Sequence, residues 1–534
     1  MSTPLTVIRA VVTASFFLGG TVAQDTLNQH KVVLDSSGRL LSWVQPQDQA
    51  YDRVVRLAWQ FLLEKVPVEP NGLKTYYAYC CLDWVKNAGT AWPHNPAGFY
   101  AMLADSAAAY YAYSGDRRVV DLTRELLNYQ ILHGTTPATW LWGGVPYASS
   151  NHGDIEYRGA YEFQYDRRNL GRGDGYGVIE PDKAGELGVG YLKFYKLTGD
   201  PIYREAALAC ARALARNVRS GSEQQSPWPF RVYAETGIVR EQYASNVIGP
   251  IHLLDEMGKM KLGEVDAFQR ASDMAWSWMM RFPIANNVWA NYFEDIPIMA
   301  QLTNFNQYAP GETARYLMDH PERDPEWRAH VKGLVAFIEK TFAVDDKEAK
   351  GWQWGANAIS EQIGFMPKMG SHTSRYASVA ARLAELTGDQ EAREKAFRSF
   401  NWATYMCREN GAVYDIPRKG NDPIWFSDGY GDYIRHVIAG MAAFPEWAPE
   451  GQNHLLRSSS IVTEIAYEGA RVRYRVFDAG AVDVLRLAFR PARVLASGKP
   501  LAERKDLDAE GWTYDPKLNV LRVRHTATDV DIAQ

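Results

Sequence analysis

The feature that most constrains the fold is a short motif that recurs three times between apolar segments with helical spacing. Ser114-Gly115-Asp116, Thr198-Gly199-Asp200 and Thr387-Gly388-Asp389 each follow one such segment and precede another. Glycine can adopt the left-handed conformation that ends a helix, and aspartate can accept hydrogen bonds from the free N–H groups at the start of the next helix. The three copies therefore predict repeated pairs of helices joined by tight turns.

The spacing of apolar residues extends this pattern to twelve helices, or six hairpins. Tight turns follow the second, fourth and tenth helices, whereas long aromatic and acidic loops precede the second, fourth, sixth, eighth, tenth and twelfth. All long loops would then open on one face, at the N-termini of alternate helices. The helices are expected near residues 51–66, 97–114, 117–133, 182–198, 202–219, 241–257, 264–281, 310–319, 325–342, 372–387, 390–410 and 428–444.

Over residues 50–450 this pattern resembles the six-hairpin, or (α/α)6 toroid, superfamily of glycoside hydrolases and polysaccharide lyases. In that superfamily an outer ring of helices wraps an inner ring, and the active cleft lies at the N-terminal ends of the inner helices. The second predicted helix, residues 97–114, is crowded with alanine, as a tightly packed inner ring requires. The resemblance implies a mainly α enzyme that acts on carbohydrate, with its site among the long loops.

Beyond Pro449 the pattern changes from helical to strand-like. β-branched and apolar residues alternate or cluster in 461–477, 482–489 and 520–523, between turns rich in Gly, Asp and Pro. This predicts a small C-terminal antiparallel β domain packed beside the toroid. The expected division is a signal peptide at 1–23, a catalytic toroid at 24–450 and a small β-sheet domain at 451–534.

The composition restricts the class of partner. Of 534 residues, 46% are hydrophobic and 23% are charged, as in soluble globular proteins. The formal charge of −5 provides no basic surface, which argues against nucleic acid as a partner, whereas 17 Trp and 30 Tyr supply rings that can stack on sugars. The four cysteines form no disulfide framework, and no CxxC or HExxH spacing is present, so no metal or cofactor is expected.

The first 23 residues have the pattern of a secretory signal peptide. Arg9 precedes an apolar run at residues 10–18, and Thr21-Val22-Ala23 is a small-x-small cleavage pattern. We therefore expect a secreted or periplasmic protein. No later run approaches the roughly 20 apolar residues that span a bilayer, so no membrane partner is expected.

The loop at residues 140–186 is the strongest candidate for part of a site, because it is rich in Trp, Tyr, Asn, His, Arg and carboxylates and runs directly into a helix. Residues 182–199 resemble the inner helix of unsaturated rhamnogalacturonyl and glucuronyl hydrolases, in which an Asp starts a helix that ends in a Thr-Gly-Asp turn. The resemblance puts Asp182 in the place of the catalytic Asp. Pro181 and Lys183 replace the aromatic residue and the Gly that flank it there. The alternative is that Asp182 only caps its helix.

Glycoside hydrolysis also needs a second carboxylate. Glu180, Glu312 and Asp428 lie at or near the entrances of predicted inner helices. Asp428 stands among aromatic residues and glycines, where desolvation could raise its pKa into the range of an acid catalyst. Each residue has a structural alternative: Asp428 could be an N-cap, and Glu312 could belong to a capping box.

Candidate binding groups are aromatic or basic and lie in or beside the same loops. Rings outside helical stripes could stack on a sugar or could instead fill gaps between helices, and guanidinium groups could bind a uronate or form internal salt bridges. The aromatic candidates are Trp142, Trp228, Trp425 and Tyr430, and the basic candidates are Arg158, Arg231 and Arg375.

A different set of residues would be consistent with a polysaccharide lyase reaction. Polysaccharide lyases on related toroids neutralise the uronate with Asn and Arg while His or Tyr removes the C5 proton. The residues that resemble such a set are Asn151, His152, Tyr157, His372 and Arg375, although a lone His is more often structural.

Three functions are therefore open. The first is a glycoside hydrolase on a uronate-bearing glycan, with Asp182 or Glu180 acting with Asp428 or Glu312. The second is a polysaccharide lyase, and the third is a non-catalytic glycan-binding protein. Sugar epimerases share this toroid and use pairs of histidines, but the export signal argues against that class.

Overall fold

The structure is a computed structural model that describes residues 26–69, 72–74, 81–83, 88–89, 95–151, 153–160, 174–293, 302–343, 353–417, 424–425 and 429–534. At 81–83, 88–89 and 424–425 only the backbone is described. The predicted signal peptide, His152 and Asp428 lie outside the described residues, as does the side chain of Trp425.

The described residues form twelve α-helices, one for each helix that the sequence predicts. Two boundaries differ by more than three residues from the expectation: α6 begins at Ile248 rather than at 241, because residues 239–241 pair in a strand, and α11 ends at Thr404 rather than at 410. The helices are α1 Ala50–Glu64, α2 Pro96–Ser114, α3 Arg118–His133, α4 Pro181–Thr198, α5 Pro201–Asn217, α6 Ile248–Lys259, α7 Val265–Met279, α8 Tyr308–Asp319, α9 Trp327–Phe342, α10 Gly370–Thr387, α11 Gln390–Thr404 and α12 Gly431–Ala443.

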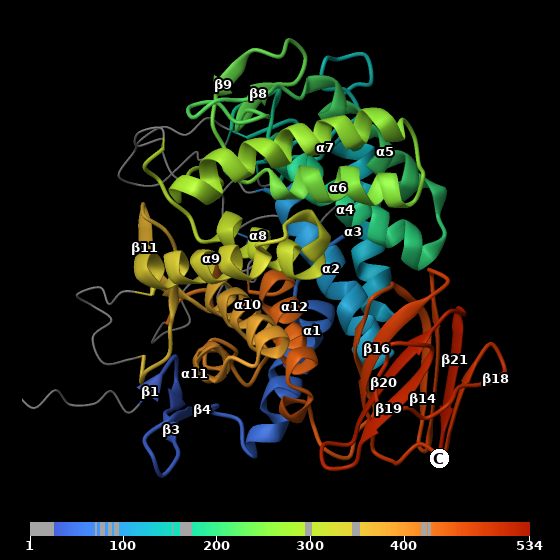
Figure 1. The fold of residues 1–534 in the computed structure, drawn as a ribbon. Coiled ribbons are helices and arrows are strands. Elements are labelled where there is room, and N and C mark those ends of the chain that lie inside the picture. The colour runs from blue at the N-terminus through green and yellow to red at the C-terminus, as the bar shows by residue number, and fades with distance from the viewer. Residues whose placement is uncertain are drawn as a thin grey trace, which may run out of the picture.

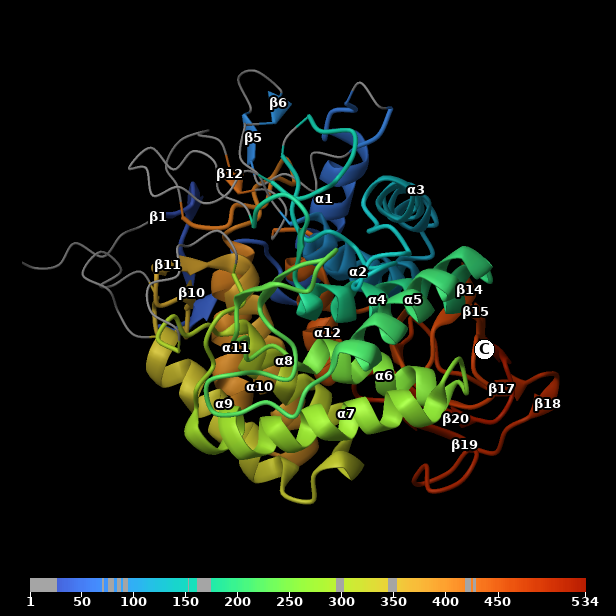
Figure 2. The same ribbon diagram turned by 90° about the horizontal axis from the view of Figure 1, so that it is seen from above.

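The helices form two concentric rings. Each even-numbered helix contacts the next even-numbered one, and α12 contacts α2, so that α2, α4, α6, α8, α10 and α12 close an inner ring. The odd-numbered helices pack outside it, each from α3 to α11 against the even-numbered helix that precedes it. The view in Figure 2 shows this arrangement of the helices. The predicted (α/α)6 toroid is therefore confirmed.

The tight turns form as the sequence predicts. Gly115, Gly199 and Gly388 end α2, α4 and α10 with φ values of 74°, 75° and 74°, a conformation that side chains with a Cβ rarely adopt. Asp200 and Asp389 then accept hydrogen bonds from the first free N–H groups of α5 and α11. These turns fix the antiparallel pairing of inner and outer helices.

Glycines allow two inner helices to pack closely. A Cβ on Gly185 would lie 2.3 Å from the backbone nitrogen of Pro250, and one on Gly188 would lie 2.4 Å from a methyl carbon of Leu253. Because such distances are impossible for a real side chain, α4 and α6 can approach this closely only with glycine at these positions. The N-terminal ends of α4 and α6 are thereby brought together.

The C-terminal residues form two antiparallel sheets around one apolar core, a sandwich rather than the single sheet expected. One sheet has the order β13-β16-β20-β19 and the other β14-β15-β21-β17-β18. The sandwich packs against α2 and α4, where His454 stacks on Tyr113 with ring centroids 4.0 Å apart. Its strands are β13 His454–Ser458, β14 Val462–Glu468, β15 Arg471–Val476, β16 Ala481–Arg486, β17 Arg493–Ala496, β18 Lys499–Pro500, β19 Gly511–Asp515, β20 Val520–His525 and β21 Asp529–Ala533.

Short strands precede several helices. The hairpin strand β11 and the sandwich lie on opposite sides of the helices (Figure 1). The strands are β1 Thr26–Leu27, β2 His30–Lys31, β3 Val33–Leu34, β4 Leu40–Leu41, β5 Cys81–Asp83, β6 Ala88–Gly89, β7 Val178–Ile179, β8 Arg231–Tyr233, β9 Val239–Glu241, β10 Ile359–Gln362, β11 Phe365–Met369 and β12 Ile424–Trp425. In the part of the chain that is described, no helix combines the length and the apolar character that crossing a membrane requires.

Candidate active site

Two carboxyl groups lie together at the N-terminal end of inner helix α4. Asp182 and Glu186 are four residues apart, which places them on the same face of the helix. Asn246, just before α6, lies between them: its Nδ2 is 2.7 Å from Glu186 Oε1 and 3.4 Å from Asp182 Oδ2. Asp182 is only 3% exposed, and its Oδ1 accepts a hydrogen bond of 2.9 Å from the backbone N–H of Lys183.

This pair favours the protonated state. Burial raises the pKa of Asp182 to about 7; Glu186 contributes to the rise, whereas Lys183 and the hydrogen-bond donors oppose it. Burial likewise raises the pKa of Glu186. Two neighbouring carboxyls with little access to water cannot both ionise easily, so the pair retains a proton near neutral pH.

A buried lysine and two stacked tyrosines complete the surroundings of the pair. The ammonium of Lys183 lies 3.1 Å from the centroid of the Tyr292 ring, in a cation–π contact. Tyr292 stacks on Tyr308 with centroids 3.9 Å apart, and its hydroxyl lies 3.4 Å from Glu186 Oε2. Lys183 is therefore held beside the carboxyl pair rather than in solvent.

Glu312 and Asp432 lie on the same inner ring but in a different electrostatic setting. Arg435 contacts Glu312 at 3.1 Å and Asp432 at 2.7 Å, and Arg375 also binds both carboxylates. Burial alone would raise the pKa of Glu312, but Arg315, Arg435 and Arg375 outweigh it and lower the value to about 2. The pKa of Asp432 is likewise held well below its usual range, despite burial, by Arg375 and Arg435.

These contacts correct two of the predicted roles. Glu312 is a permanent anion in a salt-bridge network, so it does not fit the role of a proton donor. Arg375, expected to bind a uronate, is buried between Glu312 and Asp432. The alternative of internal salt bridges therefore describes Arg375, and Glu312 belongs to the same salt-bridge network rather than to the capping box considered for it.

Glu180 and Arg231 also belong to a buried ion cluster. The Arg231 guanidinium lies 3.2 Å from Glu180, 2.6 Å from Asp174 and 2.8 Å from Glu241. All four side chains are buried. This cluster joins the end of the 140–186 loop to strands β8 and β9. Glu180, expected to be catalytic, and Arg231, expected to bind substrate, are therefore both paired with protein groups.

The predicted aromatic platforms are mostly buried, which corrects the expectation that they line an open cleft. Trp142 and Trp228 are 3% and 2% exposed, and the Trp228 indole donates to the carbonyl of Leu214. Tyr430 is fully buried against Phe61. Rings without an exposed face cannot stack on a sugar, so the alternative of aromatic residues filling gaps between elements describes these three.

Of the two histidines predicted as a lyase base, only His372 belongs to the described residues, and its surroundings do not favour that role. His372 is buried, and burial followed by the nearby Arg375 lowers its pKa to about 3. Its Nδ1 lies 3.1 Å from the Arg375 guanidinium, which can only donate, so this nitrogen is an acceptor. Such a weakly basic imidazole is poorly suited to remove a proton.

Of the remaining predicted binding residues, two contact other protein groups and one is exposed. Asn151 donates to Asp154 and to the Tyr176 hydroxyl, and Tyr157 is buried with its hydroxyl 3.3 Å from that of Tyr100. Arg158 is different: its side chain is 68% exposed and only 3.7 Å from Glu156, a weak surface contact.

The sequence analysis did not single out Glu186, Asn246, Tyr292 or Tyr308 as site residues. The four-residue spacing of Asp182 and Glu186 was a usable signal, because it puts both carboxyls on one helical face. Asn246 and the tyrosines come from other elements, and nothing local marks them. Among the residues that the structure describes, no group of three or more His, Cys, Asp or Glu side chains is placed to hold a metal ion.

Comparison with known proteins supports the fold. No family model and no curated protein matches the chain. Similar solved structures include D-mannose isomerase, with a TM-score of 0.53 and 11% identity over 76% of this chain and 99% of that one. The cellobiose 2-epimerase from Bacillus thermoamylovorans B4167 has a TM-score of 0.51 and 10% identity over 73% and 98% of the two chains.

The cellobiose 2-epimerase from Spirochaeta thermophila DSM 6192 has a TM-score of 0.50 and 11% identity over 74% of this chain and 94% of that one. Each solved chain is matched almost completely, whereas about a quarter of this chain lies outside the match. The (α/α)6 toroid is thus a fold that this chain shares with carbohydrate-active enzymes, and identities this low show the fold alone.

Proposed function

We propose that the protein is a glycoside hydrolase in which Asp182 donates a proton to the leaving oxygen of the scissile bond. The observation that carries this proposal is the buried Asp182–Glu186 pair at the N-terminal end of an inner helix. A carboxyl with a pKa of about 7 is about half protonated at neutral pH and is still acidic enough to donate.

Glu186, Asn246 and Lys183 act as positioning residues in this scheme. Glu186 raises the pKa of Asp182 by its own charge, and Asn246 fixes the distance between the two carboxyls. Lys183 lowers the pKa of both carboxyls, because its ammonium favours the ionised form. It therefore opposes protonation of both groups at once. Together they keep one proton on two carboxyl groups.

The proposed substrate is an oligosaccharide that contains a uronic acid. The resemblance of residues 182–199 to the inner helix of unsaturated uronyl hydrolases supports this substrate class. Of the three arginines predicted to bind the acid, Arg158 is the one whose guanidinium is exposed, and the other two bind protein carboxylates. Arg158 is thus the proposed contact for the substrate carboxylate.

Incubation with uronate-containing oligosaccharides, followed by mass spectrometry and ultraviolet absorption, separates the possible reactions. A hydrolase adds one water across the cleaved bond. A lyase adds none and produces an absorbing C4–C5 double bond, an epimerase leaves the mass unchanged, and a binding protein returns the ligand intact. Products that have gained water without the new absorption are the expected result.

Asp182→Asn is the direct test of the assigned residue. Asparagine has nearly the same shape and can still accept the hydrogen bond from the Lys183 N–H, so the fold should remain, while turnover should fall by about a hundredfold or more for the loss of a general acid. Asp182→Asn that retains full turnover would leave Asp182 with a structural role only and contradict the proposal.

We also propose that residues 1–23 direct export to the periplasm or the medium. The support is Arg9, the following apolar run and the small-x-small pattern at 21–23. Fractionation of cells that express the full chain, compared with a chain lacking residues 2–23, tests this. Retention of the full chain in the cytoplasm would contradict it.

A further inference from the structure

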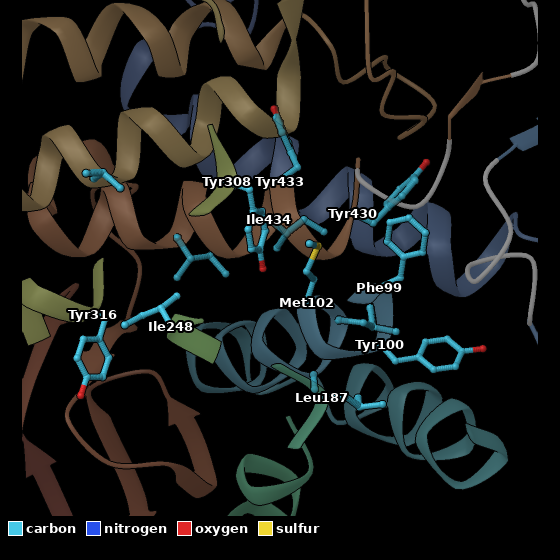
Figure 3. Close-up of a cluster of buried hydrophobic side chains, with 14 of the residues drawn as sticks. Phe99, Tyr100, Met102, Leu187, Ile248, Tyr308, Tyr316, Tyr430, Tyr433 and Ile434 are labelled. Atoms are coloured by element: carbon cyan, nitrogen blue, oxygen red, sulfur yellow. The ribbon is translucent and has the colours of Figure 1, made fainter. Parts of the chain in front are cut away.

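A cavity of about 110 Å³ follows the axis of the inner ring and is lined by residues of α2, α4, α6, α8 and α12 and by His320. Along α8 it follows one face, from Tyr308 at the first residue through Glu312 and Arg315 to Asp319 at the last. At 1.5 Å per residue this face is about 16 Å long. The cavity therefore extends from the loop end of the ring to its opposite end. Figure 3 shows Met102, Ile248, Tyr308 and Ile434, which come from four of these helices, around the interior.

Solvent exposure rises along the charged residues of this face, although Tyr316 among them is only 5% exposed. Tyr308 is 3% exposed, and the side chains of Glu312, Arg315 and Asp319 are 16%, 28% and 64% exposed. On α4 the cavity runs in the same direction, from Glu186 to Lys193, whose side chain is 26% exposed. The cavity thus opens at the C-terminal end of the ring.

The two members of the carboxyl pair differ in their access to this space. Glu186 lines the cavity, and Asp182 is not among the lining residues. Asp182 lies one turn nearer the loops, where it is buried. Only one of the two carboxyls is therefore open to the C-terminal end.

The walls of the cavity are suited to water. Asp105 pairs with Lys193 and lies 3.2 Å from Arg435 and 3.6 Å from Arg315, so charged groups face the space from three directions. A water molecule occupies about 30 Å³ in the liquid and needs two to four polar partners, and this lining offers such partners along its whole length.

We propose that the axial cavity is a water-filled proton route that connects Glu186 to solvent at the end of the ring opposite the loops. The inference rests on the proposed role of Asp182 as the proton donor. Substrate would approach the carboxyl pair from the loop side, while protons reach Glu186 from the other side.

Such a route would supply the proton that the carboxyl pair needs after each reaction cycle. When Asp182 gives its proton to the leaving oxygen, the pair is left one proton short. The water that attacks the anomeric carbon passes its proton to solvent on the loop side, so the pair must take up one proton from solvent before the next cycle. A chain of waters lets Glu186 take one up from solvent without passing the bound sugar, and the pair again holds one proton.

Thiol labelling tests the opening without reference to activity. Ala101 lines the cavity, whereas Ala104, one turn further along α2, is fully buried and is not among the lining residues. In a background with Cys80→Ser and Cys81→Ser, the variants Ala101→Cys and Ala104→Cys are treated with 2-aminoethyl methanethiosulfonate and weighed. Cys210 and Cys407 are buried and should not react. Rapid modification of Ala101→Cys alone is expected; equal rates for the two variants would overturn the proposal.

A filled cavity tests the role in turnover. Ala101→Phe should lower kcat by about tenfold, with little change in KM. The loss should be smaller than the factor of about a hundred that a positioned proton donor contributes, because only the return of the proton is slowed. Ala109→Phe, on the same helix but outside the cavity lining, is the control and should leave kcat near that of the unmodified protein. An unchanged kcat in Ala101→Phe would overturn the route. Full activity of Asp182→Asn would instead refute the proposed function, and the labelling result would still decide whether the cavity is open.

Discussion

Two pairs of carboxylates lie on the inner ring of this toroid, and they differ in charge state although burial raises the pKa of every member. Asp182 and Glu186 on α4 have one ammonium, that of Lys183, beside them, and their pKa values are raised. Glu312 on α8 and Asp432 on α12 share Arg375 and Arg435, and their pKa values are lowered. Burial raises the pKa in all four cases, so the number and position of cations decide the outcome. The comparison assigns proton chemistry to the first pair and a structural role to the second.

The largest effect on stability is expected from breaking the salt-bridge network of Glu312 and Asp432. Arg375→Met removes a buried guanidinium from two carboxylates and leaves them uncompensated, which typically costs about 3–5 kcal/mol of unfolding free energy. Urea denaturation measures it. Arg158→Met, at an exposed position with only a weak surface contact, should change stability by no more than about 0.5 kcal/mol. Similar small losses in both variants would show that the network is not stabilising.

A smaller effect, of opposite sign, is expected at Asp182. Its folded pKa of about 7 lies above the unfolded value of about 3.9, so between these pH values the folded protein holds a proton that the unfolded chain releases. Stability is therefore lost as pH rises through this window. Asp182→Asn removes this penalty and should be more stable than the unmodified protein at pH 8. The difference in unfolding free energy between the variant and the unmodified protein should be more favourable to the variant at pH 8 than at pH 4, by at least about 1.4 kcal/mol.

Asp432→Asn is the matched variant for this comparison. Because Asp432 is ionised and paired, its loss should destabilise the protein at pH 8, where Asp182→Asn stabilises it. Denaturant curves of the two variants at both pH values provide the test. Destabilisation by both variants at pH 8 would remove the distinction between the pairs.

The smallest effect is expected from Tyr292→Phe. The Tyr292 hydroxyl lies 3.4 Å from Glu186, a long hydrogen bond, so its removal should cost about 0.5–1.5 kcal/mol and leave the ring stack with Tyr308 intact. It should also move the acidic limb of activity slightly toward higher pH, because a donor that favours the charged form of Glu186 is lost. Thermal unfolding and a pH–rate profile measure the two effects.

The helices could be predicted from the sequence because their signals are local. Gly115, Gly199 and Gly388 end helices and the aspartates that follow begin others, so both boundaries are contained in three or four residues. The start of α6 was misplaced because residues 239–241 pair with a strand, and strand pairing depends on a partner that the local pattern does not show.

The site could be predicted only in part for the same reason. Asp182 was marked by its place at a helix entrance, whereas Glu186 was not predicted, although its four-residue spacing from Asp182 could have marked it. The contacts of Asn246 with both carboxyls, and of Arg375 with Asp432, join residues 57 to 64 positions apart on different elements. Such contacts depend on how separate elements pack, and so does the burial of Trp142 and Trp228, which the sequence alone left open.

The most direct test of the central assignment is the titration of Asp182 itself. Infrared difference spectra between the unmodified protein and Asp182→Asn isolate the carbonyl stretch of the protonated Asp182 carboxyl. We expect this band to persist at pH 6, to fall to about half its intensity around pH 7 and to disappear at higher pH, with the pair Asp182–Glu186 titrating as a unit. A band already absent at pH 5 would mean that Asp182 is ionised like Glu312 and Asp432, and the assignment of Asp182 as the proton donor would be contradicted.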